Sequence, residues 1–260
     1  MKSGSGCCAS PDLIESADAP GERIGDHRPT RTSTLTTAPT PARRRKIRAV
    51  AVVIPAHDEQ DSLAHCLTAV QAAAWRARRR GIDVLITVVA DSCSDATRAI
   101  ARRRGADCLT IQANDVSAAR TVGVTHALSR LGELHFGLPE IYLLHTDAHT
   151  VVEPAWIGRH LEAAADHDAV FGPVHVRDRI TPDKESVPVH LHQHGTENAP
   201  GLGAYTAANL GVRADAYTRA GGLPTMSFAE DRAVASTLRA TGASVVFRRD
   251  VAVTVSSRPA

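Results

Sequence analysis

The segment Ala49-Val50-Ala51-Val52-Val53-Ile54 is an uninterrupted apolar run that ends at Pro55. A short run of this kind, without polar alternation, is typical of a strand buried on both faces, as in the middle of a parallel sheet. Apolar residues then recur at helical spacing from Leu63 to Ala74, and Gly81 ends that pattern. A buried strand followed by an amphipathic helix predicts a βα unit, and this segment therefore indicates an α/β fold.

The alternation of strand and helix patterns continues along the chain. We expect further strands at 84–89, 108–111, 141–145, 169–176, 207–213, 244–247 and 251–255. We expect further helices at about 95–104, 117–131, 155–165 and 229–240. Strands that alternate with long helices form right-handed βαβ units. The sequence thus predicts a parallel sheet flanked by helices.

The amino-terminal part of the chain differs in composition from the rest. Residues 1 to about 45 are rich in Ser, Thr, Pro, Gly and charged residues, and their apolar residues are isolated. Such a segment cannot bury enough apolar surface to offset the entropy lost on ordering it. The predicted organisation is a disordered leader at 1–46 and one α/β domain at 47–260.

Charge and cysteine content narrow the class of protein. The formal net charge is +2, and the basic residues gather in short runs at 43–48 and 78–80, which argues against a nucleic-acid-binding face. The run at 43–48 is either a solvated segment or a peripheral contact with an anionic membrane surface. The five cysteines include no CxxC pair, and no apolar stretch is long enough for a signal core or a membrane span. We therefore expect a cytoplasmic protein, with any membrane contact at the inner face.

Polar segments follow three of the predicted strands. They are 55–59, 90–95 and 146–150, and each contains at least one Asp or Glu. Ligands of parallel α/β sheets bind beyond the carboxyl ends of the strands. The sequence therefore predicts the functional site at this edge of the sheet.

Five segments, in this order along the chain, resemble motifs of family 2 glycosyltransferases. They are 52–59, 88–97, 118–123, 143–150 and the stretch 208–231, which holds Ala208–Arg213, Gly221-Gly222 and Glu230-Asp231. The resemblance runs from about residue 49 to the carboxyl terminus. It implies the GT-A fold, with a Rossmann-like, mostly parallel central sheet. It also implies an inverting, hexosyltransferase-type enzyme that moves a sugar from a nucleotide-diphosphate donor to an acceptor hydroxyl.

The segment 143–150 resembles the DxD-bearing motif, with Asp147 at the first acid and His149 where the family has the second. The resemblance implies a divalent metal, Mn²⁺ or Mg²⁺, that stabilises charge on the leaving diphosphate. Imidazole is a good ligand for Mn²⁺ and a poor one for Mg²⁺. Three interpretations stay open: His149 is a ligand together with Asp147, Asp147 alone anchors the metal, or the site is degenerate.

The resemblance also implies roles for other residues. Asp231 is the expected base for the acceptor hydroxyl, with Glu230 as its supporting neighbour. Substrate contacts are expected from Pro55, His57, Glu59, Asp91, Arg120 and Asn209. From the residues alone, Asp91 also fits a turn, and Glu230-Asp231 also fits a solvated helix start favoured by the helix dipole.

Other polar residues have plainer interpretations. Asp58, Asp61 and Asp95 are expected helix caps. The histidines at 190, 192 and 194 alternate within a Pro-containing loop at 178–203, as part of a polar lid or as zinc ligands.

Two other functions compete with glycosyl transfer. One is a catalytically degenerate nucleotide-binding pseudoenzyme, suggested by His149. The other is a sugar-phosphate nucleotidyltransferase, which needs a Gly-rich loop after the first strand, and segment 55–59 contains no glycine. A dinucleotide oxidoreductase is disfavoured because no GxGxxG follows that strand.

Overall fold

The computed structural model describes residues 45–177, 187–188, 206–223 and 231–256, and all statements on structure concern these residues. The predicted leader lies outside them up to residue 44, as do most of the 178–203 loop and Glu230. None of the described helices combines the length and hydropathy that a bilayer crossing requires.

The strands of the central sheet and the helices that flank it follow the predicted alternation of strand and helix. The strands are β1 (Ala49–Ala56), β2 (Asp83–Asp91), β3 (Asp107–Ile111), β4 (Ile141–Thr146), β6 (Ala169–Phe171), β9 (Asn209–Arg213) and β10 (Val245–Phe247). The helices are α1 (Leu63–Arg78), α2 (Thr97–Arg103), α3 (Val116–Glu133), α4 (Trp156–Ala163), α5 (Ala214–Arg219) and α6 (Asp231–Ala240), with short 3-10 turns η1 (Leu138–Glu140) and η3 (Arg249–Val251).

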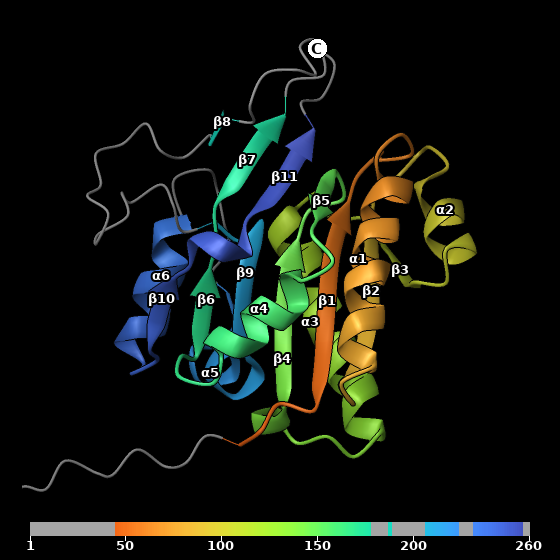
Figure 1. The fold of residues 1–260 in the computed structure, drawn as a ribbon. Helices are drawn as coiled ribbons and strands as arrows, with labels where there is room; N and C mark the ends of the chain where they lie inside the picture. Colours follow the sequence, from red (N-terminus) through yellow and green to blue (C-terminus); the bar gives the residue numbers. More distant parts are fainter. Residues whose placement is uncertain (1–44, 178–186, 189–205, 224–230, 257–260) are drawn as a thin grey trace, which may run out of the picture. The chain divides into compact units, whose positions relative to one another are not determined.

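The central sheet has the strand order β10-β6-β9-β4-β1-β2-β3 (Figure 1). β1 pairs in parallel with β2 and β4, and β2 with β3. β9 is antiparallel to both of its neighbours, β4 and β6. The predicted mostly parallel sheet is therefore confirmed, with one reversed strand inside it.

Alternate residues of β1 face two separate apolar layers. Val50, Val52 and Ile54 pack with α1 and α4 on one face. Ala49, Ala51 and Val53 pack with α3, α5 and α6 on the other. Because β1 is covered on both faces, its sequence is apolar throughout rather than alternating. Each fully buried Val or Ile side chain stabilises the fold by about 1.5–3 kcal/mol relative to exposure.

The structure does not confirm the predicted N-caps of α1 and α2. The capping prediction for Asp58 and Asp61 at α1 is wrong, because the helix starts after Ser62 and no side chain caps it. Asp95 is not the N-cap of α2, which is Ala96, although its Oδ1 accepts a hydrogen bond from the N–H of Thr97, the first residue of α2, at 2.9 Å.

A second sheet, which the sequence pattern did not predict, has the order β5-β11-β7-β8. Its strands are β5 (Thr150–Val152), β11 (Val253–Ser256), β7 (Val174–Arg177) and β8 (Val187–Pro188). The single strand expected at 169–176 is therefore two strands in two sheets, and Gly172 and Pro173 separate them. A Cβ on Gly172 would lie 2.6 Å from Asn209 Nδ2 and 2.8 Å from the Val251 carbonyl oxygen, so only glycine fits where the chain leaves the first sheet.

Candidate active site

The carboxyl ends of β1, β2 and β4 lie side by side. Ala56 at the end of β1 is in register with Ala90 of β2, and Val53 is in register with His145 of β4. The polar segments that follow these strands therefore meet at one edge of the sheet, as the sequence predicted.

An ion pair joins the start of α3 to the turn after β4. Arg120 Nη2 donates to Asp147 Oδ1 at 2.7 Å, and Arg120 is 8% exposed. The start of α3 is fixed by Asp115, whose Oδ1 accepts from the N–H groups of Ser117 and Ala118. The sequence indicated Arg120 and Asp147 separately, and the structure shows that they are partners.

The Asp147 backbone is held from the core side. Its carbonyl oxygen accepts from the Cys66 thiol at 3.4 Å and from the Thr150 N–H at 3.1 Å. Burial, and to a lesser degree the Asp147 carboxylate, raises the pKa of Cys66 to about 12. The thiol therefore remains a protonated donor at neutral pH. No local sequence pattern indicates this contact, which spans 81 residues of chain.

A second pair joins the turns after β1 and β4. His149 Nδ1 lies 3.3 Å from Glu59 Oε1, and the Glu59 side chain is far more buried than the imidazole, at 7% against 26% exposed. Ser62 Oγ donates to Glu59 Oε2. Glu59, expected as a substrate contact, is thus a buried neighbour of His149.

The Asp91 carboxylate organises the loop before α3. Its two oxygens accept from the backbone N–H groups of Ala113, Asn114 and Asp115 at 2.7–2.9 Å, and from the Ser92 hydroxyl at 3.0 Å. Burial raises the pKa of this carboxyl, but the three backbone hydrogen bonds outweigh burial and hold the pKa below its usual value. The turn interpretation of Asp91 is therefore confirmed, and its donor contact stays a prediction.

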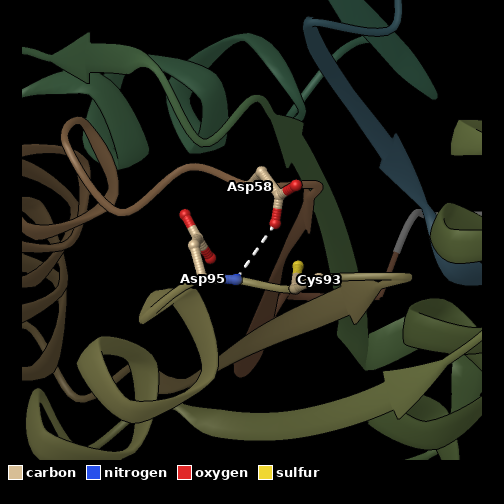
Figure 2. Close-up of side chains that lie close together, drawn as sticks. All are labelled: Asp58, Cys93 and Asp95. Carbon is tan, nitrogen blue, oxygen red and sulfur yellow. Dashed lines mark hydrogen bonds between the residues drawn. The ribbon is translucent and has the colours of Figure 1, made fainter.

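The turns after β1 and β2 are clasped together by Asp58, Cys93 and Asp95 (Figure 2). Asp58, with a left-handed backbone (φ 49°), accepts from the N–H of Ser94 at 2.8 Å and of Asp95 at 3.3 Å. The Cys93 thiol donates to the Ala56 carbonyl oxygen at 3.3 Å. Within the described ranges, this is the group of three or more acidic, His or Cys side chains whose ligand atoms all lie within 4.8 Å of one another. The hydrogen bonds of these three residues join the two turns, and they explain why the side chains lie close together.

Two further predicted substrate contacts lie beside this clasp. His57 Nδ1 donates to the Asp91 carbonyl oxygen at 2.8 Å, since a carbonyl only accepts, so His57 also ties the first turn to the second. Pro55 is buried within β1, in register with Val89. Both residues shape the edge on which the donor is expected.

Asn209, the predicted acceptor-side residue, is fully buried. Its Oδ1 accepts from Trp156 Nε1 at 3.0 Å and lies 3.3 Å from His160 Nε2. Its Nδ2 donates to the carbonyl oxygens of Pro173 and Val251. Asn209 therefore ties β9 to α4 and to the start of the second sheet, and any effect on an acceptor acts through this scaffold.

His145, in β4, is a fully buried polar residue for which no role was predicted from the sequence. Neither of its ring nitrogens has a hydrogen-bond partner within the part of the chain that the structure describes. Burial, with a smaller effect of Arg120, lowers the pKa of His145 to about 3, so the ring is neutral at physiological pH.

The predicted catalytic pair lies at the edge of the described region. Asp231 is the first residue of α6, while its side chain, Glu230 and the histidines at 190, 192 and 194 lie outside the described residues. The roles of these residues stay predictions.

Solved structures of other proteins share this arrangement of strands and helices. S. aureus TarS 1–349 in complex with UDP-GlcNAc has a TM-score of 0.58 at 14% identity, over 82% of this chain and 59% of that chain. The mannosyltransferase PcManGT from Pyrobaculum calidifontis, in complex with GDP-Man and Mn²⁺, has a TM-score of 0.55 at 15% identity, over 83% and 58%. GalNAc-T7 with UDP, GalNAc and Mn²⁺ has a TM-score of 0.54 at 14% identity, over 82% and 44%. This chain thus spans less than two thirds of each of them.

The sheet, its flanking helices and these neighbours define the GT-A fold. The family model described as Glycosyl transferase family 2 matches residues 51–211, which include the strand-end turns, the Arg120–Asp147 ion pair and the Glu59–His149 pair. The chain belongs to glycosyltransferase family 2. No curated protein matches the sequence significantly.

Proposed function

We propose that this chain is a metal-assisted, inverting glycosyltransferase that takes a sugar from a nucleotide-diphosphate donor. The observation that carries the proposal is the meeting of the Arg120–Asp147 and Glu59–His149 pairs at the carboxyl edge of a family 2 fold. Support also comes from the structural neighbours, two of which were determined with UDP-GlcNAc and GDP-Man.

Asp147 and His149 suit a divalent cation. Their side chains are 21% and 26% exposed, and they stand on one short turn that Thr150 closes through its N–H to the Asp147 carbonyl. A carboxylate oxygen and an imidazole nitrogen are donors that Mn²⁺ accepts. Cations of nucleotide sites need only one or two protein ligands, because the phosphates supply others. When bound, the cation stabilises the negative charge that develops on the leaving diphosphate.

Arg120 provides fixed positive charge at the same point. Its guanidinium lies against Asp147, and its two-pronged geometry also suits phosphate oxygens. We assign it to the diphosphate side of the donor. Asp91, Pro55 and His57 then act by fixing the turns that surround the nucleoside.

Asp231 is the proposed base, with Glu230 as its neighbour. The acceptor oxygen forms a bond to the anomeric carbon from the face opposite the diphosphate, and the bond from that carbon to the diphosphate oxygen breaks. The hydroxyl proton passes to the Asp231 carboxylate. Asn209 keeps the acceptor side in place from within the core.

A donor assay with four proteins tests the proposal. Release of nucleoside diphosphate from UDP- and GDP-sugars, with and without Mn²⁺, is measured for wild type, Asp147→Asn, Asp231→Asn and the control Asp83→Asn. Asp83 is an exposed acid at the amino end of β2, remote from the edge. We expect the first two variants to lose at least about 100-fold in rate, as for removal of a main electrostatic or base group, and the control to match wild type.

Full activity in both Asp147→Asn and Asp231→Asn would refute the mechanism. Nucleotide binding by calorimetry without turnover on any acceptor would identify a pseudoenzyme instead. A cytoplasmic location remains a prediction. So does a peripheral contact of segment 43–48 with an anionic membrane, which sedimentation with anionic lipid vesicles tests.

A further inference from the structure

The turn after β1 supplies an acid to the turn after β4. Glu59 Oε1 and His149 Nδ1 lie 3.3 Å apart although 90 residues separate them in the chain. The carboxylate is the buried partner and the imidazole the more exposed one. A buried carboxylate needs compensating polar contacts, so this pairing is part of what allows Glu59 to be buried.

Hydrogen bonds hold both the side chain and the backbone of Glu59. Its second oxygen accepts from Ser62 Oγ, and its backbone N–H donates to Thr97 Oγ1 at 2.8 Å. Its carbonyl oxygen accepts from the Leu63 N–H at 2.9 Å, at the start of α1. The carboxylate is therefore a rigid group against which the His149 ring is oriented.

The pairing decides which nitrogen of His149 carries the proton. Opposite an ionised carboxylate, which only accepts hydrogen bonds, a neutral imidazole carries its proton on the facing nitrogen, here Nδ1, and its lone pair on Nε2. Histidines that bind metals characteristically donate their other N–H to a carboxylate, which orients the ring and makes the ligating nitrogen more basic.

We propose that Glu59 is a positioning residue of the metal site, which holds His149 with the proton on Nδ1 so that Nε2 is the ligand nitrogen. The inference rests on the proposed metal-assisted function. It also accounts for the departure of this chain from the DxD pattern. The second acid is not lost from the site; it stands on the neighbouring turn and acts through the imidazole. The site keeps two carboxylate charges, Asp147 directly and Glu59 through His149.

Metal binding without nucleotide is the first test. The affinity for Mn²⁺ alone is measured by the loss of the free-ion electron paramagnetic resonance signal for wild type, Glu59→Ala, Glu59→Gln, His149→Ala and Asp147→Ala. Removal of a carboxylate that orients a histidine ligand weakens metal affinity by about 10–100-fold, and we expect this loss in Glu59→Ala. Glu59→Gln keeps an acceptor for Nδ1–H and a donor for Ser62, so it should recover part of the affinity.

A matched control removes a carboxylate–imidazole pair elsewhere. Asp107 Oδ2 lies 2.7 Å from His126 Nε2, between the amino end of β3 and α3. Asp107→Asn should bind Mn²⁺ as wild type does. Thermal unfolding of every variant identifies any that has lost its fold, and Glu59→Gln, which conserves the side-chain shape, keeps the test valid if Glu59→Ala does not fold.

The second test determines which tautomer His149 adopts. A purely structural role for Glu59 would not predict that this tautomer and the Mn²⁺ affinity change together. Long-range ¹H–¹⁵N spectra of the metal-free protein, with His149→Ala identifying the signal, should show the proton on Nδ1 in wild type and Glu59→Gln, and a shift toward Nε2 in Glu59→Ala. A wild-type proton on Nε2 would overturn the inference. So would Mn²⁺ affinity that falls in Asp147→Ala and His149→Ala but not in Glu59→Ala, a result that leaves the proposed function standing. Unchanged affinity in all three variants would overturn both this inference and the metal-assisted step, while donor turnover would still report on glycosyl transfer itself.

Discussion

Two glycines of α3 should respond in opposite directions to the same substitution. Gly123 lies where the helix packs on the central sheet, and a Cβ there would stand 2.5 Å from Val53 Cγ1 and 2.9 Å from Val89 Cγ2. Gly132 lies near the end of the same helix, and a Cβ there would meet nothing within 4 Å. Alanine at either position improves the intrinsic helix propensity, but only at Gly123 does it create a clash.

The sign of each change in the free energy of unfolding depends on whether the gain in helix propensity exceeds the cost of the clash. Replacing glycine by alanine in a helix stabilises by about 0.5–1 kcal/mol when the site has room. Adding a methyl group to a filled interior costs about 1–3 kcal/mol. Val53 and Val89 belong to adjacent sheet strands and have no flexible end that could swing away, so the clash is not relieved locally. Gly123→Ala should therefore lower the free energy of unfolding by about 0–2 kcal/mol, and Gly132→Ala should raise it by about 0.5–1 kcal/mol.

Urea unfolding followed by circular dichroism measures both changes. The difference between the two variants, about 1–3 kcal/mol, isolates the packing cost because the propensity gain is common to both. Arg120 precedes Gly123 by one helical turn, so displacement of α3 should also weaken the Arg120–Asp147 pair and reduce donor turnover in Gly123→Ala alone. Equal stabilisation by both substitutions would show that α3 does not pack on β1 and β2 as described.

Two further predictions concern buried titratable groups. Asp91→Asn should lower the free energy of unfolding near neutral pH by about 1.5–3 kcal/mol, because at least one hydrogen bond from a backbone N–H to a charged acceptor is lost. The pKa of Asp91 in the folded protein lies below its value in the unfolded chain, so the stabilisation by ionised Asp91 is present above about pH 4 and disappears as the pH falls further. The difference in unfolding free energy between wild type and Asp91→Asn should therefore shrink below that pH. A difference that does not depend on pH would contradict the role given to Asp91. His145→Leu should stabilise the protein more at about pH 5 than at about pH 8, because the unfolded chain takes up a proton near pH 6.5 while the folded His145, with a pKa of about 3, does not. The same urea titrations at both pH values check this, and an equal effect at the two values would mean that His145 is solvated or paired.

The parts of the fold predicted correctly from sequence depend on local pattern. β1, β2 and β4 are buried on both faces for most of their length, so each is a mostly apolar run that can be recognised without knowledge of its neighbours. The second sheet was missed because β5 has only three residues and pairs with β11, which was predicted as a strand at 251–255, across about a hundred residues. The break at Gly172-Pro173 depends on the close approach of Asn209 and Val251, which no local pattern records.

In the candidate site too, the features set by local pattern and topology were predicted and the long-range contacts were not. Its position at the strand ends was predicted, because topology alone brings those segments together. The pairings were not predicted, since each joins residues from different strand–helix units. Arg120 meets Asp147 across 27 residues, and the N–H groups that fix Asp91 come from a loop at least 22 residues away.

These pairings separate acids that look alike in the sequence. Asp58 and Asp91 accept hydrogen bonds from backbone N–H groups of neighbouring turns, and those groups cannot leave without unfolding the turns. The Asp147 carboxylate instead pairs with the Arg120 side chain, which can rotate toward a ligand at little cost to the backbone. A cation or a diphosphate can therefore displace the partner of Asp147 but not those of Asp58 and Asp91. Substitution of Asp58 or Asp91 should therefore act mainly on stability and substitution of Asp147 mainly on ligand binding, although all three acids lie at the same edge of the sheet.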